Sequence, residues 1–280
     1  MTDLVVEPVV RRVWSVFDGR ARVLVAEGAG SVVCVNTLSD ADAARALAST
    51  IADLAPGKPV GALVYTIDHL DQSGNGGELQ PAEVVAHELC ARVVRGRRSA
   101  GQPVVTRTIH GEGEELELDG VRVALVYPGP SQGTGNLAVE LLDHGVLYVT
   151  GPRADARYGL FADVHVEHVA RSWRRLLARE PRVVVAGRGP ALDREGFERA
   201  CRYIEAVQFA MQKAFASGVP VWSLAAVREE AVDRLAGEFA DLDGFREHVG
   251  LTALRVIHHY LMGGWGLEDT ARPELLTTEA

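Results

Sequence analysis

A change in the hydrophobic pattern near residue 192 limits the possible folds of this 280-residue chain more than any other feature. Before this point, short runs rich in Val, Ile and Tyr alternate with turns and with amphipathic helical segments. That mixture is typical of a mixed α/β protein. Beyond it no segment has the pattern of a strand, and apolar residues recur at helical spacing. We therefore predict an α/β domain over residues 1–192 and a helical segment over residues 193–280.

We predict the strands and helices from hydrophobic periodicity, turn residues and helix caps. Strands are predicted at residues 11–17, 21–27, 31–37, 60–66, 103–111, 115–118, 121–128, 136–142, 145–151 and 182–187. Helices are predicted at residues 39–55, 81–98, 166–176, 197–214, 224–242 and 245–261. Ser39, with Asp42 three residues later, is the expected N-cap of the first helix. Asp119-Gly120 predicts a hairpin turn.

A polar loop follows the apolar strand at residues 60–66. The segment YTIDHLDQSGNGG, residues 65–77, places Asp68, His69 and Asp71 directly beyond the strand end. Histidine and aspartate in such a position suggest a metal site, yet the loop has one histidine where zinc would need several donors. The loop could therefore be a metal site, the remains of one, or a polar turn.

Composition excludes several classes of function. The net charge of −9 disfavours non-specific binding to nucleic acid or to an anionic membrane. No apolar run reaches about 18 residues, and the N-terminal residues have no signal-peptide core, so we expect a cytoplasmic protein. Cys34, Cys90 and Cys201 are far apart and form no C-x-x-C pair, which predicts buried free thiols.

The order of elements, together with VGALVYTIDHLDQSGNGG at residues 60–77, resembles the metallo-β-lactamase superfamily, and in particular its alkyl sulfatase-like branch. The segments YIEAVQFAMQKAFASG and IHHYLMGGWGLEDTARPEL are similar to the helical dimerisation segment of that branch. The resemblance covers about residues 10–275. It implies an α/β fold, a metallo-β-lactamase-like αββα sandwich with a C-terminal helical dimerisation segment, and a homodimer.

The resemblance also implies that most metal-ligand positions are substituted. Where the superfamily carries H-x-H-x-D-H, residues 67–72 read I-D-H-L-D-Q, so only His69 and Asp71 keep the ligand type. The three later ligand positions fall on Ser131 or Gln132, on Gly151 or Pro152, and on Gly187 or Arg188. Because an arginine is a permanent cation that would repel a zinc ion, we predict no bound metal and no cofactor.

The predicted catalytic residues are His69, Asp71 and Arg188. Asp71 would act as a general base, with His69 as its acid partner or orienting group. Arg188 would place a guanidinium where a metal stands in the superfamily, and there it would neutralise Asp71 or bind an anionic substrate group. The residues predicted to bind substrate are Gln72, Gln132, Arg157 and Tyr158.

Two other interpretations of this loop remain. In a structural one, Asp71 and His69 cap loop amides and Arg188 makes a surface ion pair. In the other, a rearranged single-metal site uses His69, Asp71 and an acid such as Asp155 or Glu78.

Other histidines favour structural roles. His165 and His168 have a helical spacing that can bind metal, but no third ligand is evident, so we expect surface or partly buried side chains. His258 and His259 point to different faces of one helix and are expected to pack.

The sequence thus predicts a metal-independent enzyme that carries out a lyase, cyclase, isomerase or hydrolase step on a small organic molecule, in specialised metabolism. The alternative is a non-catalytic ligand-binding or assembly protein, and a further alternative is a hydrolase with a rearranged single-metal site. The expected partners are a small molecule and a second copy of the chain, with no nucleic acid and no membrane.

Overall fold

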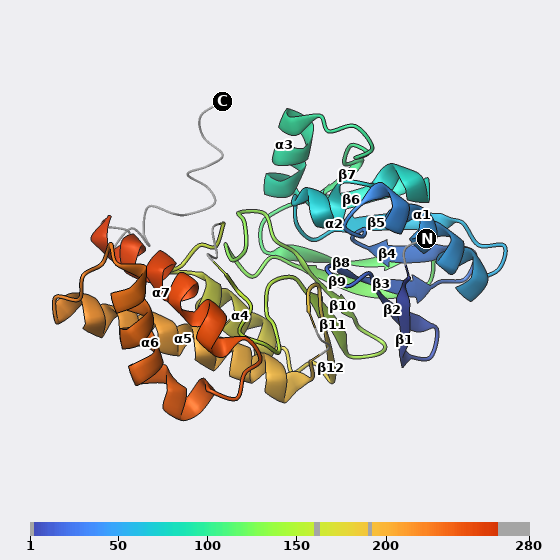
Figure 1. Cartoon of the computed structure of the whole chain (residues 1–280). Coiled ribbons are helices and arrows are strands. Elements are labelled where there is room, and N and C mark those ends of the chain that lie inside the picture. Colours follow the sequence, from blue (N-terminus) through green and yellow to red (C-terminus); the bar gives the residue numbers. More distant parts are fainter. Residues whose placement is uncertain (1–2, 160–162, 190–191, 263–280) are drawn as a thin grey trace.

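The computed structural model describes residues 3–159, 163–189 and 192–262. Two β-sheets pack against each other, helices cover their outer faces, and a helical segment lies at one end of the sandwich (Figure 1). This arrangement confirms the predicted mixed α/β fold with two sheets.

The first sheet has seven strands, which lie in the same order as in the sequence. Neighbours pair antiparallel up to β4 and parallel from β4 to β7. The parallel part needs crossover helices, and α1 and α3 supply two of them. The bounds are β1 Val5–Val10, β2 Val13–Phe17, β3 Arg22–Glu27, β4 Val32–Val35, α1 Ala41–Leu54, β5 Val60–Tyr65, β6 Glu83–His87, α3 Glu88–Arg97 and β7 Arg107–Ile109.

The second sheet has five strands in the order β12-β11-β10-β9-β8. The Asp119-Gly120 turn joins β8 to β9 as predicted, and both turn residues have positive φ, 51° and 81°. Only β11 and β12 pair parallel, with α4 lying between them in the sequence. The bounds are β8 Gly113–Leu118, β9 Val121–Val126, β10 Ala138–Leu141, β11 Val146–Val149, α4 Val169–Leu177 and β12 Val183–Ala186.

Three apolar clusters hold these layers together. Leu24 of the first sheet and Leu125 of the second belong to the cluster between the sheets. Leu47 and Ile51 of α1 pack on the outer face of the first sheet. Trp173 of α4 belongs to the cluster on the outer face of the second sheet. The helices therefore cover both faces of a sheet pair, as an αββα sandwich requires.

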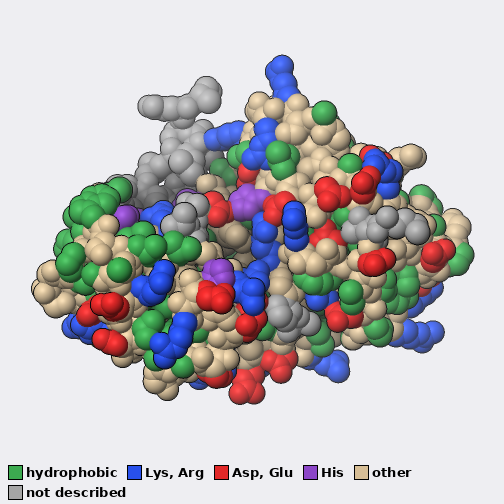
Figure 2. Space-filling model, viewed as in Figure 1, with side chains coloured by type: hydrophobic (Ala, Val, Ile, Leu, Met, Phe, Trp, Pro, Cys, Tyr) green, Lys and Arg blue, Asp and Glu red, His purple; other side chains and the backbone are tan. Residues whose placement is uncertain are grey.

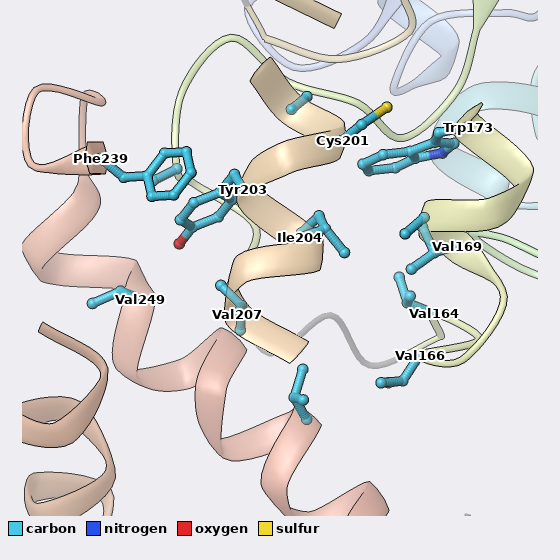
Figure 3. Packing of buried hydrophobic residues seen from close by; sticks show 14 of the residues in the cluster. Val164, Val166, Val169, Trp173, Cys201, Tyr203, Ile204, Val207, Phe239 and Val249 are labelled. Carbon is cyan, nitrogen blue, oxygen red and sulfur yellow. The ribbon is translucent and has the colours of Figure 1, made fainter. Parts of the chain in front are cut away.

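The helical segment continues the third cluster. α5 begins after Asp193, whose side chain accepts a hydrogen bond from the amide of Gly196 at 2.8 Å. The rings of Trp173 and Phe197 join α4 to α5 at a centroid distance of 6.4 Å. Figure 3 shows Tyr203 of α5 beside Phe239 of α6. The bounds are α5 Arg194–Ala216, α6 Leu224–Phe239 and α7 Phe245–Leu261. The division into two domains at residue 192 stays a prediction.

Three local predictions were wrong. The first strand, β1, was not predicted, because its exposed edge position gives residues 5–10 no apolar alternation. Residues 83–87 form β6 inside the predicted helix 81–98, because Val84 and Val85 are buried between the parallel neighbours β5 and β7. Asp40, and not Ser39, caps α1, since the Ser39 hydroxyl donates to Asp18 at 2.7 Å.

The three cysteines are buried free thiols, as predicted. Among the described residues, no helix has both the length and the apolar character that a membrane crossing requires. The cytoplasmic location stays a prediction.

Candidate functional site

The candidate site lies where β4, β5, β11 and β12 end, because the carboxyl ends of these strands meet at one edge of the sandwich. Figure 2 shows a hollow between the sandwich and the helical segment, bordered by basic, acidic and histidine side chains. The polar loop after β5 contributes a short helix, α2 (Leu70–Ser73), and a 3₁₀ turn, η1 (Gly76–Leu79).

His69, immediately before α2, pairs with an acid that the sequence did not single out. Its Nε2 lies 2.7 Å from Oδ2 of Asp163, and the two side chains are 22% and 39% exposed. Burial alone would raise the pKa of Asp163, but the hydrogen bond and charge of His69, with the charge of Arg188, hold that pKa below its ordinary value. Asp163 is therefore an ionised partner that fixes the orientation of the imidazole.

Arg188 and Asp71, both predicted as catalytic residues, form an ion pair. Nη1 of Arg188 lies 2.6 Å from Oδ2 of Asp71. The backbone of Arg188 is held by a β-bridge to Ala21. Because the charge of Arg188 also lowers the pKa of Asp163, the two ion pairs are electrostatic neighbours. The structure thus brings His69, Asp71 and Arg188 into one region.

A second arginine reaches the same loop. Arg97, in the last turn of α3, donates from Nη2 to Oδ2 of Asp68 at 2.9 Å. Asp68 is therefore engaged in an ion pair of its own beside His69.

Gln72, a predicted substrate-binding residue, is fully buried in a neutral hydrogen-bond network. Its Oε1 accepts from Nδ2 of Asn36 at 3.3 Å and from Oγ1 of Thr150 at 3.4 Å. The Asn36 amide also lies 2.7 Å from Oγ1 of Thr66 and 3.0 Å from the hydroxyl of Tyr148. Burial raises the pKa of Tyr148, which keeps its hydroxyl protonated. Amides and hydroxyls thus tie together the ends of β4, β5 and β11.

Gln132, the second predicted amide, lies on the loop before β10. Its backbone forms a β-bridge with Val164, next to Asp163. The amide of Gly133 donates to the backbone oxygen of Asp163 at 3.1 Å. This loop therefore holds in place the segment that carries the partner of His69.

Arg157 and Tyr158, also predicted to bind substrate, contact the helical segment. Arg157 pairs with Asp243 of the α6–α7 connection at 2.8 Å, and both side chains are exposed. The Tyr158 ring lies 5.7 Å from that of Tyr203 and 6.3 Å from that of Trp173. Their role in lining a substrate pocket stays a prediction.

The acids considered for a single metal ion are paired with arginines. Asp155 accepts two hydrogen bonds from Arg153, at 2.6 and 2.8 Å, and Glu78 accepts one from Arg45 at 2.9 Å. Over the described ranges of the chain, no three His, Cys, Asp or Glu side chains converge closely enough to hold a metal ion.

His165 and His168 lie just before α4, not within it. Burial lowers the pKa of His165, and nearby His168 lowers it further. His259 of α7 lies 2.6 Å from a second acid that the sequence did not single out, Glu167. His258 contacts the backbone oxygen of Val221 at 2.8 Å. The His259–Glu167 contact therefore joins α7 to the segment just before α4.

No family model matches the chain. It is 37% identical over 277 residues to 2,4-dinitroanisole O-demethylase subunit beta from Nocardioides sp. (strain JS1661), which covers 98% of this chain and 87% of the relative. It is 34% identical over 275 residues to subunit alpha from the same organism, covering 95% and 83%. The chain belongs to this O-demethylase subunit family.

Solved structures show the fold of this member of the O-demethylase subunit family. The metallo-β-lactamase from Pontibacter korlensis is similar with a TM-score of 0.64 at 20% identity, covering 72% of this chain and 99% of that one. The metallo-β-lactamase from Hirschia baltica is similar with a TM-score of 0.62 at 19% identity, covering 72% and 97%. The predicted metallo-β-lactamase fold is thereby confirmed.

Proposed function

We propose that this chain is a subunit of an enzyme that hydrolyses a small, electron-poor aromatic methyl ether in a cleft without a metal ion. The relatives' name supplies the substrate class, because 2,4-dinitroanisole is an aryl methyl ether with two electron-withdrawing groups. The observation that carries the proposal is the Arg188–Asp71 ion pair beside the His69–Asp163 pair. Such a cluster offers a base and a fixed cation, which hydrolysis requires.

The residues present do not fit the zinc centre implied by the fold. A zinc ion takes three or four nitrogen, oxygen or sulfur donors. Here His69 is engaged by Asp163, Asp71 is engaged by Arg188, and Gln72 is buried in the neutral network. We propose that the alkyl sulfatase-like ligand positions have been substituted, and we assign every step to the chain's own side chains.

His69 is the proposed general base. The sequence favoured Asp71, but that carboxylate is committed to Arg188 at 2.6 Å. An imidazole held by a carboxylate is the usual arrangement of a base that activates a nucleophile. Asp163 is then a positioning residue for His69, and Asp71 is a positioning residue for Arg188.

The proposed reaction consumes one water and yields a phenol and methanol. His69 takes a proton from water, and the water oxygen bonds to the ring carbon that carries the methoxy group. The resulting adduct is anionic, and the guanidinium of Arg188 stabilises its negative charge. The bond from the ring carbon to the methoxy oxygen then breaks, and that oxygen takes the proton from His69. No electrons enter or leave, so no oxidant is needed.

The proposed partner is a second chain of the same fold, and we take a second copy of this chain as the first candidate. The two curated relatives are named as subunits alpha and beta of one enzyme, and both match nearly the whole of this chain. On the helical segment, Phe209, Phe215, Trp222 and Met262 are between 40% and 72% exposed. Figure 2 shows hydrophobic side chains gathered at that end of the molecule. Aromatic residues and methionine are enriched in protein interfaces, so this apolar patch is the proposed contact.

A non-catalytic ligand-binding subunit is the second candidate. One observation favours it: the two relatives are named as subunits alpha and beta of one enzyme. In such an enzyme one subunit can bind the ligand while the other carries out the reaction.

The test supplies 2,4-dinitroanisole in ¹⁸O-labelled water to the purified chain, alone and mixed with either Nocardioides subunit. Labelled phenol and unlabelled methanol are expected, with turnover lost in His69→Ala. Labelled methanol would place the attack at the methyl carbon and contradict the proposed step. No turnover in any mixture, with ligand still bound, would support the non-catalytic candidate.

A further inference from the structure

Several buried polar groups around the cleft have no hydrogen-bond partner in the described part of the chain. They are Nε2 of Gln72, Oε1 of Gln132, Nδ2 and Oδ1 of Asn136, and Nε1 of Trp173. Buried polar atoms in native proteins nearly always have a hydrogen-bond partner, and a buried atom without one lowers the stability of the fold. A cluster of such atoms beside a proposed active site therefore indicates a place where a ligand completes the hydrogen bonds.

Gly151 brings three of these groups together. A methyl group at Gly151 would lie 3.0 Å from Cζ2 of Trp173 and 3.4 Å from Oε1 of Gln132. The residue before it, Thr150, bonds to the amide of Gln72. Gly151 has a φ of +116°, which other residues rarely adopt. The Trp173 ring and the Gln132 amide therefore lie close against the Gly151 backbone, where any larger side chain would crowd both of them.

Gly133 connects the fourth group to the proposed base. A methyl group there would lie 3.5 Å from Oδ1 of Asn136, 3.6 Å from Oδ1 of Asp68 and 4.0 Å from Nε2 of His69. Asn136 itself is 3% exposed. The orphaned groups therefore extend from Trp173 to the immediate neighbourhood of His69. We call Gln72, Gln132, Asn136 and Trp173 the inner wall of the cleft.

We propose that the inner wall is a subsite for a neutral, planar acceptor group on the substrate ring, and specifically for a nitro group; the aromatic substrate itself rests on the proposed function. An indole N–H donates only, and a side-chain amide can present its N–H by rotating about its last bond. Figure 3 shows the indole nitrogen of Trp173 on the side of the ring away from Cys201 and α5.

The charge of the inner wall selects against anionic substituents. Its four side chains are neutral, whereas a carboxylate or phosphate on the ring would be drawn to the guanidinium of Arg188. A nitro group carries two acceptor oxygens and no net charge, so uncharged N–H donors match it. The subsite therefore holds the nitro group apart from Arg188, which stays available for the charge that develops in the reaction.

The experiment measures binding by equilibrium dialysis, with 2,4-dinitroanisole and with anisole, which lacks nitro groups. Trp173→Phe removes the N–H and keeps an aromatic ring. We expect it to weaken 2,4-dinitroanisole binding about threefold to tenfold, the usual effect of one neutral hydrogen bond, and to change anisole binding less than twofold. Trp14→Phe is the matched control, because Trp14 packs on the α1 side of the first sheet. It should change neither affinity.

Gln132→Leu is the second variant and carries the test if Trp173→Phe fails to fold. It lies on a half-buried loop and should weaken 2,4-dinitroanisole binding selectively. Equal losses for both ligands would show packing alone and overturn the proposal. So would unchanged affinity in the folded variants, or a wild-type chain that binds both ligands equally.

Binding is measured without turnover, so the two proposals can fail separately. A chain that never turns over but discriminates through Trp173 and Gln132 keeps the subsite and loses the catalytic function. A chain that hydrolyses 2,4-dinitroanisole with unchanged nitro selectivity in both variants keeps the function and loses the subsite.

Discussion

Arg188 and Asp71 lie just beyond strands of different sheets, and their side chains meet at 2.6 Å. Arg188 follows β12 in the second sheet, and Asp71 follows β5 in the first. An ion pair thus joins the two layers at the edge where the proposed reaction takes place. A permanent cation fixed at this point is available to an anionic adduct without reorganisation.

Replacing Arg188 should therefore reduce catalysis more than binding. Arg188→Met removes the charge, and we expect kcat for phenol release to fall about 100-fold or more, with KM changed little. Arg188→Lys keeps a charge but loses the planar fork, so it should recover part of the rate. Asp71→Asn leaves Arg188 without its ionised partner, and its kcat should lie between those of Arg188→Met and Arg188→Lys. Initial rates at saturating substrate check this order, and a wild-type kcat in Arg188→Met would contradict the role.

Asp163→Asn should also slow the reaction, because the imidazole of His69 loses its ionised partner. We expect a loss of about 10²-fold or more in kcat/KM across the pH range, with the fold unchanged by circular dichroism. Asp243→Asn is the control, since it removes an exposed acid paired with Arg157 at the α6–α7 connection. Equal rates in the two variants would show that the His69–Asp163 pair has only a structural role.

The same pair predicts a pH dependence of stability. The folded pKa of Asp163 lies below its ordinary value of 3.8, so folding favours the carboxylate. Its contribution is then complete above that ordinary value and is lost as the pH falls through the folded value. The Tm difference between wild type and Asp163→Asn should therefore stay constant from pH 7 to about pH 5 and shrink only as melts are recorded below about pH 4. A difference that grows in acid would contradict the sign of this shift.

The three cysteines should be unreactive in the native state. Burial raises the pKa of Cys34 and of Cys201 to about 12 and also raises that of Cys90. Thiolates are the reactive species, so Ellman's reagent should label none of the three rapidly until denaturant is added. One fast-reacting thiol in the native protein would show that a cysteine is accessible.

The apolar patch on the helical segment should control association. Trp222→Asp or Phe209→Asp is expected to convert a dimer into a monomer in light scattering after size exclusion. Val104→Asp, which places the same charge at a 65% exposed apolar residue outside the patch, should leave the dimer intact. A monomeric wild type would reject self-association.

The parts of the fold that were predicted correctly are those with strong local signals. α7 spans residues 245–261 as expected, because its apolar residues repeat at helical spacing. The hairpin at Asp119-Gly120 was marked by a dipeptide that tolerates positive φ. Residues 83–87 were wrongly predicted as helical, because no turn residue separates this short buried strand from the helix that follows it.

At the site, some residues could be predicted from their charge and their position in the chain, and others could not. Arg188 was singled out because the resemblance implies a metal ligand at or beside this position, and the structure places its guanidinium 2.6 Å from Asp71. Asp163 was missed because its partner His69 is remote in sequence and no motif connects them. The Asn36 network and Trp173 were missed because neutral amides, hydroxyls and an indole give no signal until folding brings them together.

The most direct test of the account is the metal content of the active protein. The chain is purified without chelator or added metal, zinc, iron and manganese are counted per chain, and 2,4-dinitroanisole turnover is measured on the same sample before and after dialysis against EDTA. For a metal-independent site we expect far less than one ion per chain and an unchanged rate. One or two firmly held ions per chain, lost together with activity, would contradict it.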